Sequence, residues 1–390
     1  MFTVSRSRRK FLTGAAGLTA VAALSACGPM PMGGAGLPAG KPVPVALLVP
    51  SGSASSTDLL LAQSLENAAR LAIADLQGVQ IDLRVYGTAG QAAQAASAAT
   101  QAVNDGALVI LGPLYAHSAN AAGNAVRGSG VNVLSFSNNA DVAGGNVFVL
   151  GPTFDNTADR LVSFAARQGK RRIVMVHART PAGELARAAV TRAAARSAAT
   201  VVATVGYEMS QNGVVSAASQ VVSAAKANGA DLVVLDATTD GALPVLSQLI
   251  REQGLTSDVA QVGGLARWDV PAQAAGLPGL QGGIFALPNP GLTQQFEARY
   301  TAAYGTPPVP AAVVGLAYDG IAAVGALVKM GKTDLSAAAL TQGAGFAGVS
   351  GVFRLRPDGT NQRGLAIAQI QNSQVVVIDP APTSFGGAGF

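Results

Sequence analysis

The sequence has very few of the side chains that carry most enzyme and metal chemistry. Its 390 residues include one cysteine and only two histidines, His117 and His177. A single thiol excludes a disulfide within the chain, and so few imidazoles argue against a His-based metal site or catalytic dyad. Only 12% of the residues are charged, and no basic stripe with interleaved aromatics indicates a nucleic-acid partner. We therefore expect no catalytic residue, no metal and no cofactor.

One short motif has the spelling of a dinucleotide site but the wrong surroundings. Residues 343–348 read G-x-G-x-x-G. A dinucleotide site needs this run directly after a strand and at the start of a helix. Here a predicted helix precedes the run and a predicted strand follows it. The order is reversed, so we expect no NAD site.

The amino-terminal segment has the layout of an export signal. Four basic residues and no acid lie within the first ten positions, before an apolar stretch too short and too rich in Gly and Thr to span a membrane. Residues 7–12 (SRRKFL) resemble the twin-arginine signal for folded proteins. Residues 24–27 (LSAC) resemble a lipobox. We predict that residues 1–26 are removed as a signal peptide and that Cys27 carries a lipid anchor.

The rest of the chain alternates between strand-like and helix-like segments. Residues 27–42 are rich in Gly and Pro and indicate a flexible tether. From residue 43, short apolar runs alternate with segments of helical period, and the alternation restarts near residue 151. Short, fully apolar strands between helices predict parallel sheets covered on both faces. We predict the α/β class, with two Rossmann-like lobes.

Candidate ligand contacts lie in the loops that follow predicted strands. In an open parallel sheet, ligands bind beyond the carboxyl ends of the strands, where loops lead into helix starts. The candidates are Ser51, Gly52, Tyr115, His117, Ser118, Ser135, Ser137, Asn138, Asn139, Asp236 and Trp268. Individually, such polar residues often only cap helices, and capping is the favoured role for Asp236. Trp268 can either close over a ligand or pack against its own lobe.

Several motifs near the end of the chain point to one family. They are residues 296–300 (FEARY), 304–308 (YGTPP), 317–319 (AYD), and 346–351 (FAGVSG) followed by Phe353 and residues 358–359 (DG). They resemble motifs of the type I periplasmic-binding-protein family, in its leucine/isoleucine/valine-binding branch. The resemblance implies two lobes that close on a ligand by hinge motion. It also implies three crossings between the lobes, near residues 151–155, 286–289 and 345–348.

The resemblance divides the chain into discontinuous lobes. Lobe 1 is predicted to comprise residues 43–150 and 288–345. Lobe 2 is predicted to comprise residues 151–287 and 346–379, and residues 380–390 form a Gly-rich tail.

The residues at the family's ligand positions differ from those of its amino-acid receptors. Those receptors hold the ligand carboxylate with Ser and Thr groups of the first lobe and the ammonium partly with an acid of the second. Here the hydroxyl expected near Ala116 is absent, and the run Ala-Ala-Thr reads Ser137-Asn138-Asn139. The expected tyrosine falls at Pro181, and the expected acid falls within residues 265–267, which contain none. A buried ammonium without a counter-charge is costly, so a free α-amino acid is not expected.

A neighbouring branch of the same fold gives the closer match in this region. Residues 112–114 (GPL), 136–138 (FSN) and 142–148 (VAGGNVF) resemble the lipoproteins called penicillin-binding protein activators. The resemblance implies a non-enzymatic regulator of peptidoglycan synthesis whose partner is a peptidoglycan synthase. Gly28 after the lipidated cysteine implies anchoring in the outer rather than the inner membrane. The alternative is a lipid-anchored receptor that delivers amino acids or another small polar solute to an ABC permease.

Overall fold

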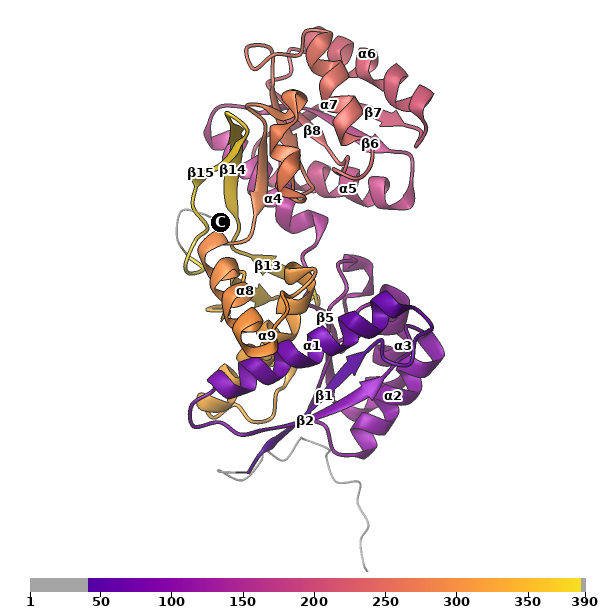
Figure 1. Cartoon of the computed structure of the whole chain (residues 1–390), viewed down its shortest axis with the longest axis vertical. Helices are drawn as coiled ribbons and strands as arrows, with labels where there is room; N and C mark the ends of the chain where they lie inside the picture. The colour runs from indigo at the N-terminus through magenta and orange to yellow at the C-terminus, as the bar shows by residue number, and fades with distance from the viewer. Residues whose placement is uncertain (1–40, 387–390) are drawn as a thin grey trace, which may run out of the picture. The chain divides into compact units, whose positions relative to one another are not determined.

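The computed structural model describes residues 41–386, which contain two large sheets (Figure 1). The first sheet has the order β2-β1-β3-β4-β5, and all neighbouring strands are parallel. Its strands are β1 (Val43–Val49), β2 (Ile81–Gly87), β3 (Val109–Leu111), β4 (Asn132–Ser135) and β5 (Val147–Val149). The strand order reverses between β1 and β3. The carboxyl ends of these two strands therefore form the switch point at which open α/β sheets bind ligands.

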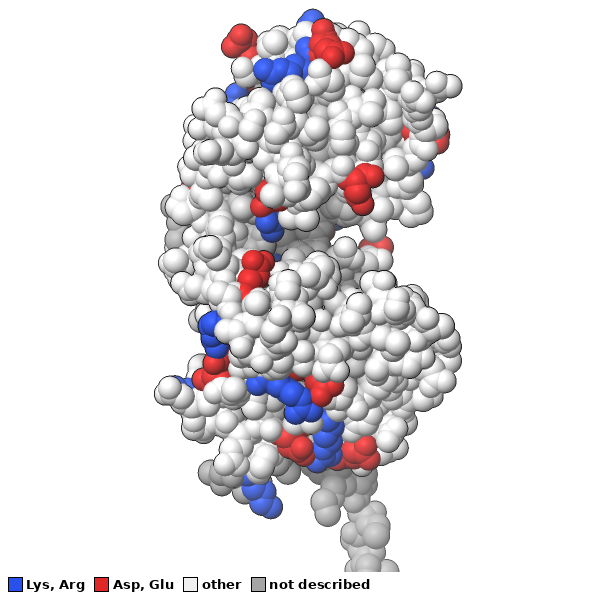
Figure 2. Space-filling view, in the orientation of Figure 1, with Lys and Arg blue, Asp and Glu red and all other residues white. Residues whose placement is uncertain are grey.

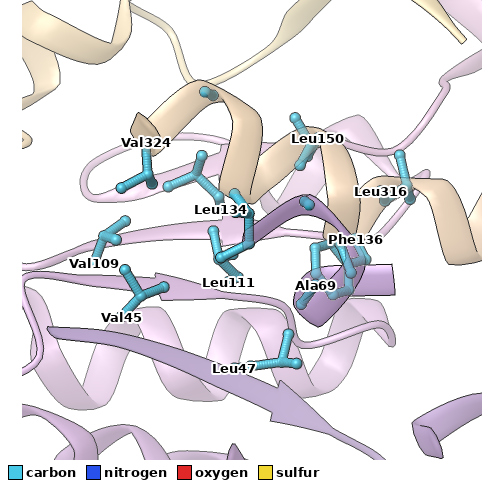
Figure 3. Close-up of a cluster of buried hydrophobic side chains, with 14 of the residues drawn as sticks. Val45, Leu47, Ala69, Val109, Leu111, Leu134, Phe136, Leu150, Leu316 and Val324 are labelled. Atoms are coloured by element: carbon cyan, nitrogen blue, oxygen red, sulfur yellow. The ribbon is translucent and has the colours of Figure 1, made fainter. Parts of the chain in front are cut away.

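Helices cover both faces of this sheet. They are α1 (Ser56–Asp75), α2 (Ala92–Asn104), α3 (Ala116–Val126), α8 (Pro290–Tyr304), α9 (Ala311–Lys329) and α10 (Ala337–Leu340). Val45 and Leu47 of β1 pack in the cluster formed with α1 and α9, which Figure 3 shows in close-up. Ala46 and Leu48 pack in the opposite cluster, formed with α2 and α3. Because both faces are buried, β1 is apolar throughout rather than alternating.

The second sheet has the order β15-β14-β10-β9-β8-β6-β7. The strands are β6 (Arg172–Ala178), β7 (Thr200–Tyr207), β8 (Leu232–Leu235), β9 (Gln261–Gly264), β10 (Ile284–Leu287), β14 (Ala366–Gln371) and β15 (Gln374–Asp379). Strands β6 to β10 are parallel, whereas β14 and β15 run antiparallel to their neighbours. The switch point lies between β6 and β8. The flanking helices are α4 (Phe154–Arg167), α5 (Pro181–Arg196), α6 (Gln211–Ala227) and α7 (Leu243–Glu252). The predicted α/β class with parallel, helix-covered sheets is confirmed.

A third, three-stranded sheet lies near the crossings. It consists of β11 (Phe346–Gly348), β12 (Gly351–Leu355) and β13 (Asn361–Arg363), all antiparallel. We predicted the third crossing at residues 345–348 and assigned residues from 346 to lobe 2. Instead, Phe346, Phe353 and Leu355 are buried in the core of the first lobe. Alternate residues of β12 point into that core. The chain therefore joins the second sheet only after β13 has ended at Arg363, and β14 begins at Ala366.

Helix α9 is long and apolar enough to span a membrane by length and composition. Its residues Val314, Ile321 and Val324 are fully buried in the first core, beside α1. The hydrophobicity of α9 is thus explained by its place in the core.

The end of the chain packs on the protein as far as the structure describes it. Residues 380–390 were predicted as a tail. Within this stretch Ala381 is buried, and the Phe385 ring lies 4.6 Å from the guanidinium carbon of Arg354.

Candidate functional site

At the switch point of the first sheet, a tyrosine and an acid from two helices meet. Tyr115 follows β3 and is the N-cap residue of α3, while Asp58 lies in the first turn of α1. The Tyr115 hydroxyl donates a 2.5 Å hydrogen bond to Asp58 Oδ1. This bond, together with burial, raises the pKa of Tyr115 to about 12. Gly90 lies against the ring in the left-handed conformation (φ +68°), where a side chain would be both strained and crowded.

His117 lies next to this pair, in the first turn of α3. Its ring stacks parallel to Tyr115, with centroids 5.7 Å apart. His117 Nε2 lies 2.9 Å from the Gly90 carbonyl oxygen, so this nitrogen carries the proton and donates it. In the neutral ring, Nδ1 is then an acceptor and can donate to a carboxylate only after protonation.

Three of the four serines predicted to contact a ligand, Ser118, Ser135 and Ser137, are buried. Ser118 is fully buried, and its hydroxyl has no hydrogen-bond partner among residues 41–386. The Ser135 hydroxyl donates to the Pro113 carbonyl, and Ser137 accepts from the Asn139 amide. The structure therefore uses Ser135 and Ser137 to hold the loop after β4 rather than to present hydroxyl groups on its surface.

Four other predicted residues of the first lobe do reach the surface. Asn138 is exposed and makes no side-chain hydrogen bond to the described part of the chain. Asn139 is partly buried and caps a short 3-10 helix by accepting from the Asp141 amide. Ser51 is partly buried beside Gly87, and Gly52 is exposed with φ +84°. The first turn of α3 has no side-chain cap, so its first amide groups are also free to bind an anion.

At the switch point of the second sheet, Asp236 is held by two strands. It follows β8, and its Oδ2 accepts a 2.9 Å hydrogen bond from the Ala178 amide at the end of β6. Its Oδ1 accepts a 3.1 Å bond from the hydroxyl of Tyr207, the last residue of β7. Burial raises the pKa of Asp236, which these two bonds oppose, and burial together with the Asp236 charge also raises the pKa of Tyr207.

The favoured sequence interpretation of Asp236 as a helix cap is wrong. Helix α7 begins only at Leu243, with Ala242 as its uncapped N-cap residue. The carboxylate turns instead toward the neighbouring strand ends. The start of helix α5 packs closely against these strand ends. A side chain at Gly183 would collide with the Ala178 carbonyl oxygen.

Several charged residues near these strand ends were not singled out from the sequence. Arg267 Nε donates a 2.6 Å bond to Asp269 Oδ1 in the loop after β9. Asp269 is thus an acid just beyond residues 265–267, and it is already paired. Arg179 and Glu208 follow β6 and β7 and form an exposed pair, 3.3 Å apart. Their positions directly after strands were the one signal in the sequence that could have indicated them.

Trp268 does not lie in a ligand crevice. The side chain is fully buried in the core of the second lobe, with its ring centroid 6.1 Å from that of Phe285. The ring fills the space above two glycines, Gly264 and Gly283, where any side chain would collide with it. The prediction that placed Trp268 among the ligand contacts is therefore wrong, because the two glycines leave a slot that only a large flat ring fills.

Two predictions remain to be placed: the lipidated cysteine with its export signal, and the absence of a metal site. Cys27 and the export signal lie outside the described residues. Within residues 41–386, no three His, Cys, Asp or Glu side chains gather in a way that could hold a metal ion.

Comparison with known proteins identifies the family to which the chain belongs. A family model described as "Periplasmic binding protein" matches residues 42–374. A branched-chain amino acid ABC transporter periplasmic ligand-binding protein from Burkholderia xenovorans LB400 is 21% identical with a TM-score of 0.67, covering 88% of this chain and 97% of its own. An ABC transporter substrate-binding protein from Desulfitobacterium hafniense in complex with Leu is 18% identical (TM-score 0.62, 87% and 100%).

A third similar structure has a different ligand. It is a solute-binding protein of an ABC transporter from Rhodopseudomonas palustris BisB5, in complex with 3,4-dihydroxybenzoic acid. It is 17% identical to this chain (TM-score 0.59), covering 88% of this chain and 97% of its own. The search of curated proteins gave no match.

Proposed function

Because the chain belongs to the periplasmic binding protein family, we propose that it is the receptor of an ABC transporter for a small solute that carries a carboxylate. Family membership confirms the resemblance stated from the sequence and the absence of enzymatic activity, and it assigns the chain to the periplasm. The observation that carries the proposal is the pair of polar clusters, Tyr115–Asp58–His117 and Asp236–Tyr207, at the switch points of the two sheets.

The first lobe would bind the carboxylate. Asn138 offers an exposed amide, and the uncapped first turn of α3 offers backbone N–H groups beside it in the neighbouring strand-end loop. No basic side chain is needed, since such amides stabilise an anion well. The ligands of two similar receptors, leucine and 3,4-dihydroxybenzoic acid, share a carboxylate and little else.

The second lobe would decide whether the solute also carries an ammonium group. Asp236 is the acid best placed to pair with one, because it lies at the switch point and already has an ordered hydrogen-bond network. Asp269 is neutralised by Arg267 and is less suited. An amino acid would therefore depend on Asp236, whereas a simple carboxylic acid would not.

The activator function remains the alternative. It rests on residues 112–114, which follow β3, residues 136–138, which follow β4, and residues 142–148, which lead into β5. The similar structures found are transport receptors, which supports the receptor over the activator. We also propose that Cys27 anchors the receptor through lipid, with the outer membrane as the expected site if the activator function holds.

The proposal is tested by calorimetry on purified protein with leucine, other amino acids, benzoate and 3,4-dihydroxybenzoate. We expect one of these carboxylates to bind. Asn138→Asp should then weaken binding about 10- to 100-fold, because it exchanges a donor for a negative charge facing the carboxylate. Asn212→Asp is the matched control: it makes the same change at an exposed position of α6, far along the chain, and should not alter affinity.

The same titrations separate the alternatives. Loss of binding in Asp236→Asn for amino acids but not for benzoate would assign the ammonium to Asp236. Binding to a purified peptidoglycan synthase, with no response to any carboxylate, would contradict the receptor and favour the activator.

A further inference from the structure

A second cavity lies along α4 and is lined by arginines. Its volume is about 350 Å³, within the range of small-molecule sites. Six arginines line it, from α4, the start of β6, the end of α5 and the β12–β13 hairpin: Arg160, Arg167, Arg171, Arg196, Arg356 and Arg363. The protein as a whole has few charged residues, and Figure 2 shows a face that is mostly uncharged. A cavity with this composition is therefore not the result of a generally basic surface.

Two of these arginines are buried and have donors without partners. Arg160 is 5% exposed and Arg363 is 7% exposed. Arg160 Nε donates to the Leu365 carbonyl and its Nη2 lies 2.9 Å from Asp379, but its Nη1 has no partner within residues 41–386. Arg363 bonds through both terminal nitrogens, but its Nε likewise has none. Both side chains line the same cavity and add positive charge to its wall, while these two donor atoms are themselves closed off from solvent.

The acids at the cavity do not balance its positive charge. Asp159 is the one acid in the lining, and it is paired with Arg196. Asp379 is shared by Arg160 and Arg167. Arg171 and Arg356 form no ion pair with any described residue. Arg363 is paired with Asp319, so three acids of the described chain stand against the six lining arginines, and the cavity keeps an excess of positive charge that suits an anionic ligand.

The cavity is separate from the switch-point loops. Arg171 lies at the amino end of β6 and Ser197 follows the last residue of α5. Asp236 and Tyr207 lie at the opposite, carboxyl ends of the strands. A molecule in this cavity would not occupy the crevice of the proposed receptor function.

We propose that this cavity is a binding site for a phosphate group carried by a small molecule or a lipid headgroup. Guanidinium groups form paired, planar hydrogen bonds with phosphate oxygens, and a phosphate monoester supplies nearly two negative charges. Arg171 and Arg356, which have no acid partner in the described part of the chain, pair with the phosphate oxygens, and the other lining arginines add to the positive charge around it. The site is independent of the solute that the crevice binds.

The test is calorimetry of the purified protein with glycerol 3-phosphate and with pyrophosphate, at constant ionic strength. We expect saturable binding that falls at least about tenfold in the double variant Arg171→Gln/Arg356→Gln. Both residues are unpaired, and Arg171 is exposed, so the variant should fold normally, as circular dichroism and thermal unfolding would verify. The matched control, Arg70→Gln/Arg187→Gln, removes two charges of α1 and α5 that lie outside the cavity lining and should leave binding unchanged.

A second arm distinguishes the source of the phosphate. Co-sedimentation of the unlipidated protein with vesicles that contain phosphatidic acid, whose headgroup is a phosphate monoester, lost in the same double variant, would assign the site to a lipid headgroup. Binding of glycerol 3-phosphate without vesicle binding would assign it to a soluble molecule. Equal weakening in both double variants, or no saturable binding to any of these probes, would overturn the proposal.

Discussion

Arg363 Nη1 lies 3.4 Å from Asp319 Oδ2, and both side chains are buried. Asp319 comes from α9 and Arg363 from β13, immediately before the chain crosses into the second sheet. Asp319 Oδ1 also accepts from the Val349 amide, and Arg363 Nη2 donates to the Leu150 carbonyl at the first crossing. One buried ion pair thus ties two of the three crossings to the core helix of the first lobe.

This pair predicts a large loss of stability when its charge balance is broken. In Asp319→Asn the amide keeps the shape of the side chain but leaves Arg363 buried without a counter-charge. We expect the free energy of unfolding to fall by about 3–5 kcal/mol, measured by urea denaturation. Glu66→Gln, in the exposed pair with Arg70, should cost less than about 1 kcal/mol. Similar values for the two variants would contradict the role assigned to the buried pair.

The same residues show what could be predicted from the sequence. The A-Y-D and F-x-G-v-x-G motifs indicated the family, and they meet in space: a side chain at Gly348 would collide with Asp319. The sequence could identify these two motifs because so close a contact permits few other side chains at either position. The third crossing was misplaced because Phe346 and Phe353 suit either core by their polarity, and only packing assigns them to the first.

The candidate ligand contacts were less predictable than the fold. Position after a strand suggested Tyr115, His117 and Asp236, and the structure places all three at the switch points, while their role in ligand binding stays a prediction. It could not show that Ser135 and Ser137 turn their hydroxyls toward their own loop, since that depends on backbone conformation. Tyr207 was not selected, because a strand-end tyrosine has no local signature of its partner across the sheet.

Because Trp268 is buried in the core of the second lobe, we predict that its fluorescence does not respond to ligand binding. It is the only tryptophan in the chain and is fully buried. We expect emission typical of an apolar environment and little change on addition of a ligand that binds the crevice. Trp268→Ala should lower stability by about 3–5 kcal/mol, with ligand affinity retained in the folded protein. A large spectral change on ligand binding would instead indicate that Trp268 lies at the ligand crevice.

The lipobox predicts that anchoring depends on one side chain. Cys27→Ser should remain unlipidated and be absent from the membrane fraction, because no other acceptor thiol exists in the sequence. Fractionation of cells followed by immunoblotting measures this outcome. Membrane retention at the level of the unaltered protein would mean that another element anchors the chain.

The paired arginines predict the export route. Arg8→Lys with Arg9→Lys should block export, since twin-arginine recognition does not accept ammonium groups in place of the guanidinium pair. The precursor should accumulate in the cytoplasm. Normal amounts of processed protein in the periplasm would assign export to the general secretory route.

The raised pKa of Asp236 predicts how stability depends on pH. Burial makes folded Asp236 hold its proton to a higher pH than the unfolded chain does, whose carboxylate titrates at about 3.9. Above that value the unfolded state binds fewer protons at this group, so its contribution to stability falls as pH rises through the folded pKa. Relative to Asp236→Asn, the unaltered protein should therefore lose stability as the pH rises from about 3.9 to the raised pKa of folded Asp236. Above that pKa its relative stability should stay constant, as urea unfolding at a series of pH values would measure.

Asp240, four residues further on, provides a control of opposite sign. It is exposed, and hydrogen bonds from Thr238 and its own backbone amide lower its pKa. Its contribution should be present above the ordinary carboxylate pKa and be lost as pH falls through the lowered value. The difference in the free energy of unfolding between the unaltered protein and Asp240→Asn should therefore grow with rising pH. The corresponding difference for Asp236→Asn should shrink. If the two differences in the free energy of unfolding change in the same direction with pH, burial is not what sets the pKa of Asp236. The hydrogen bonds from Tyr207 and Ala178 alone would then have to explain its place at the second switch point.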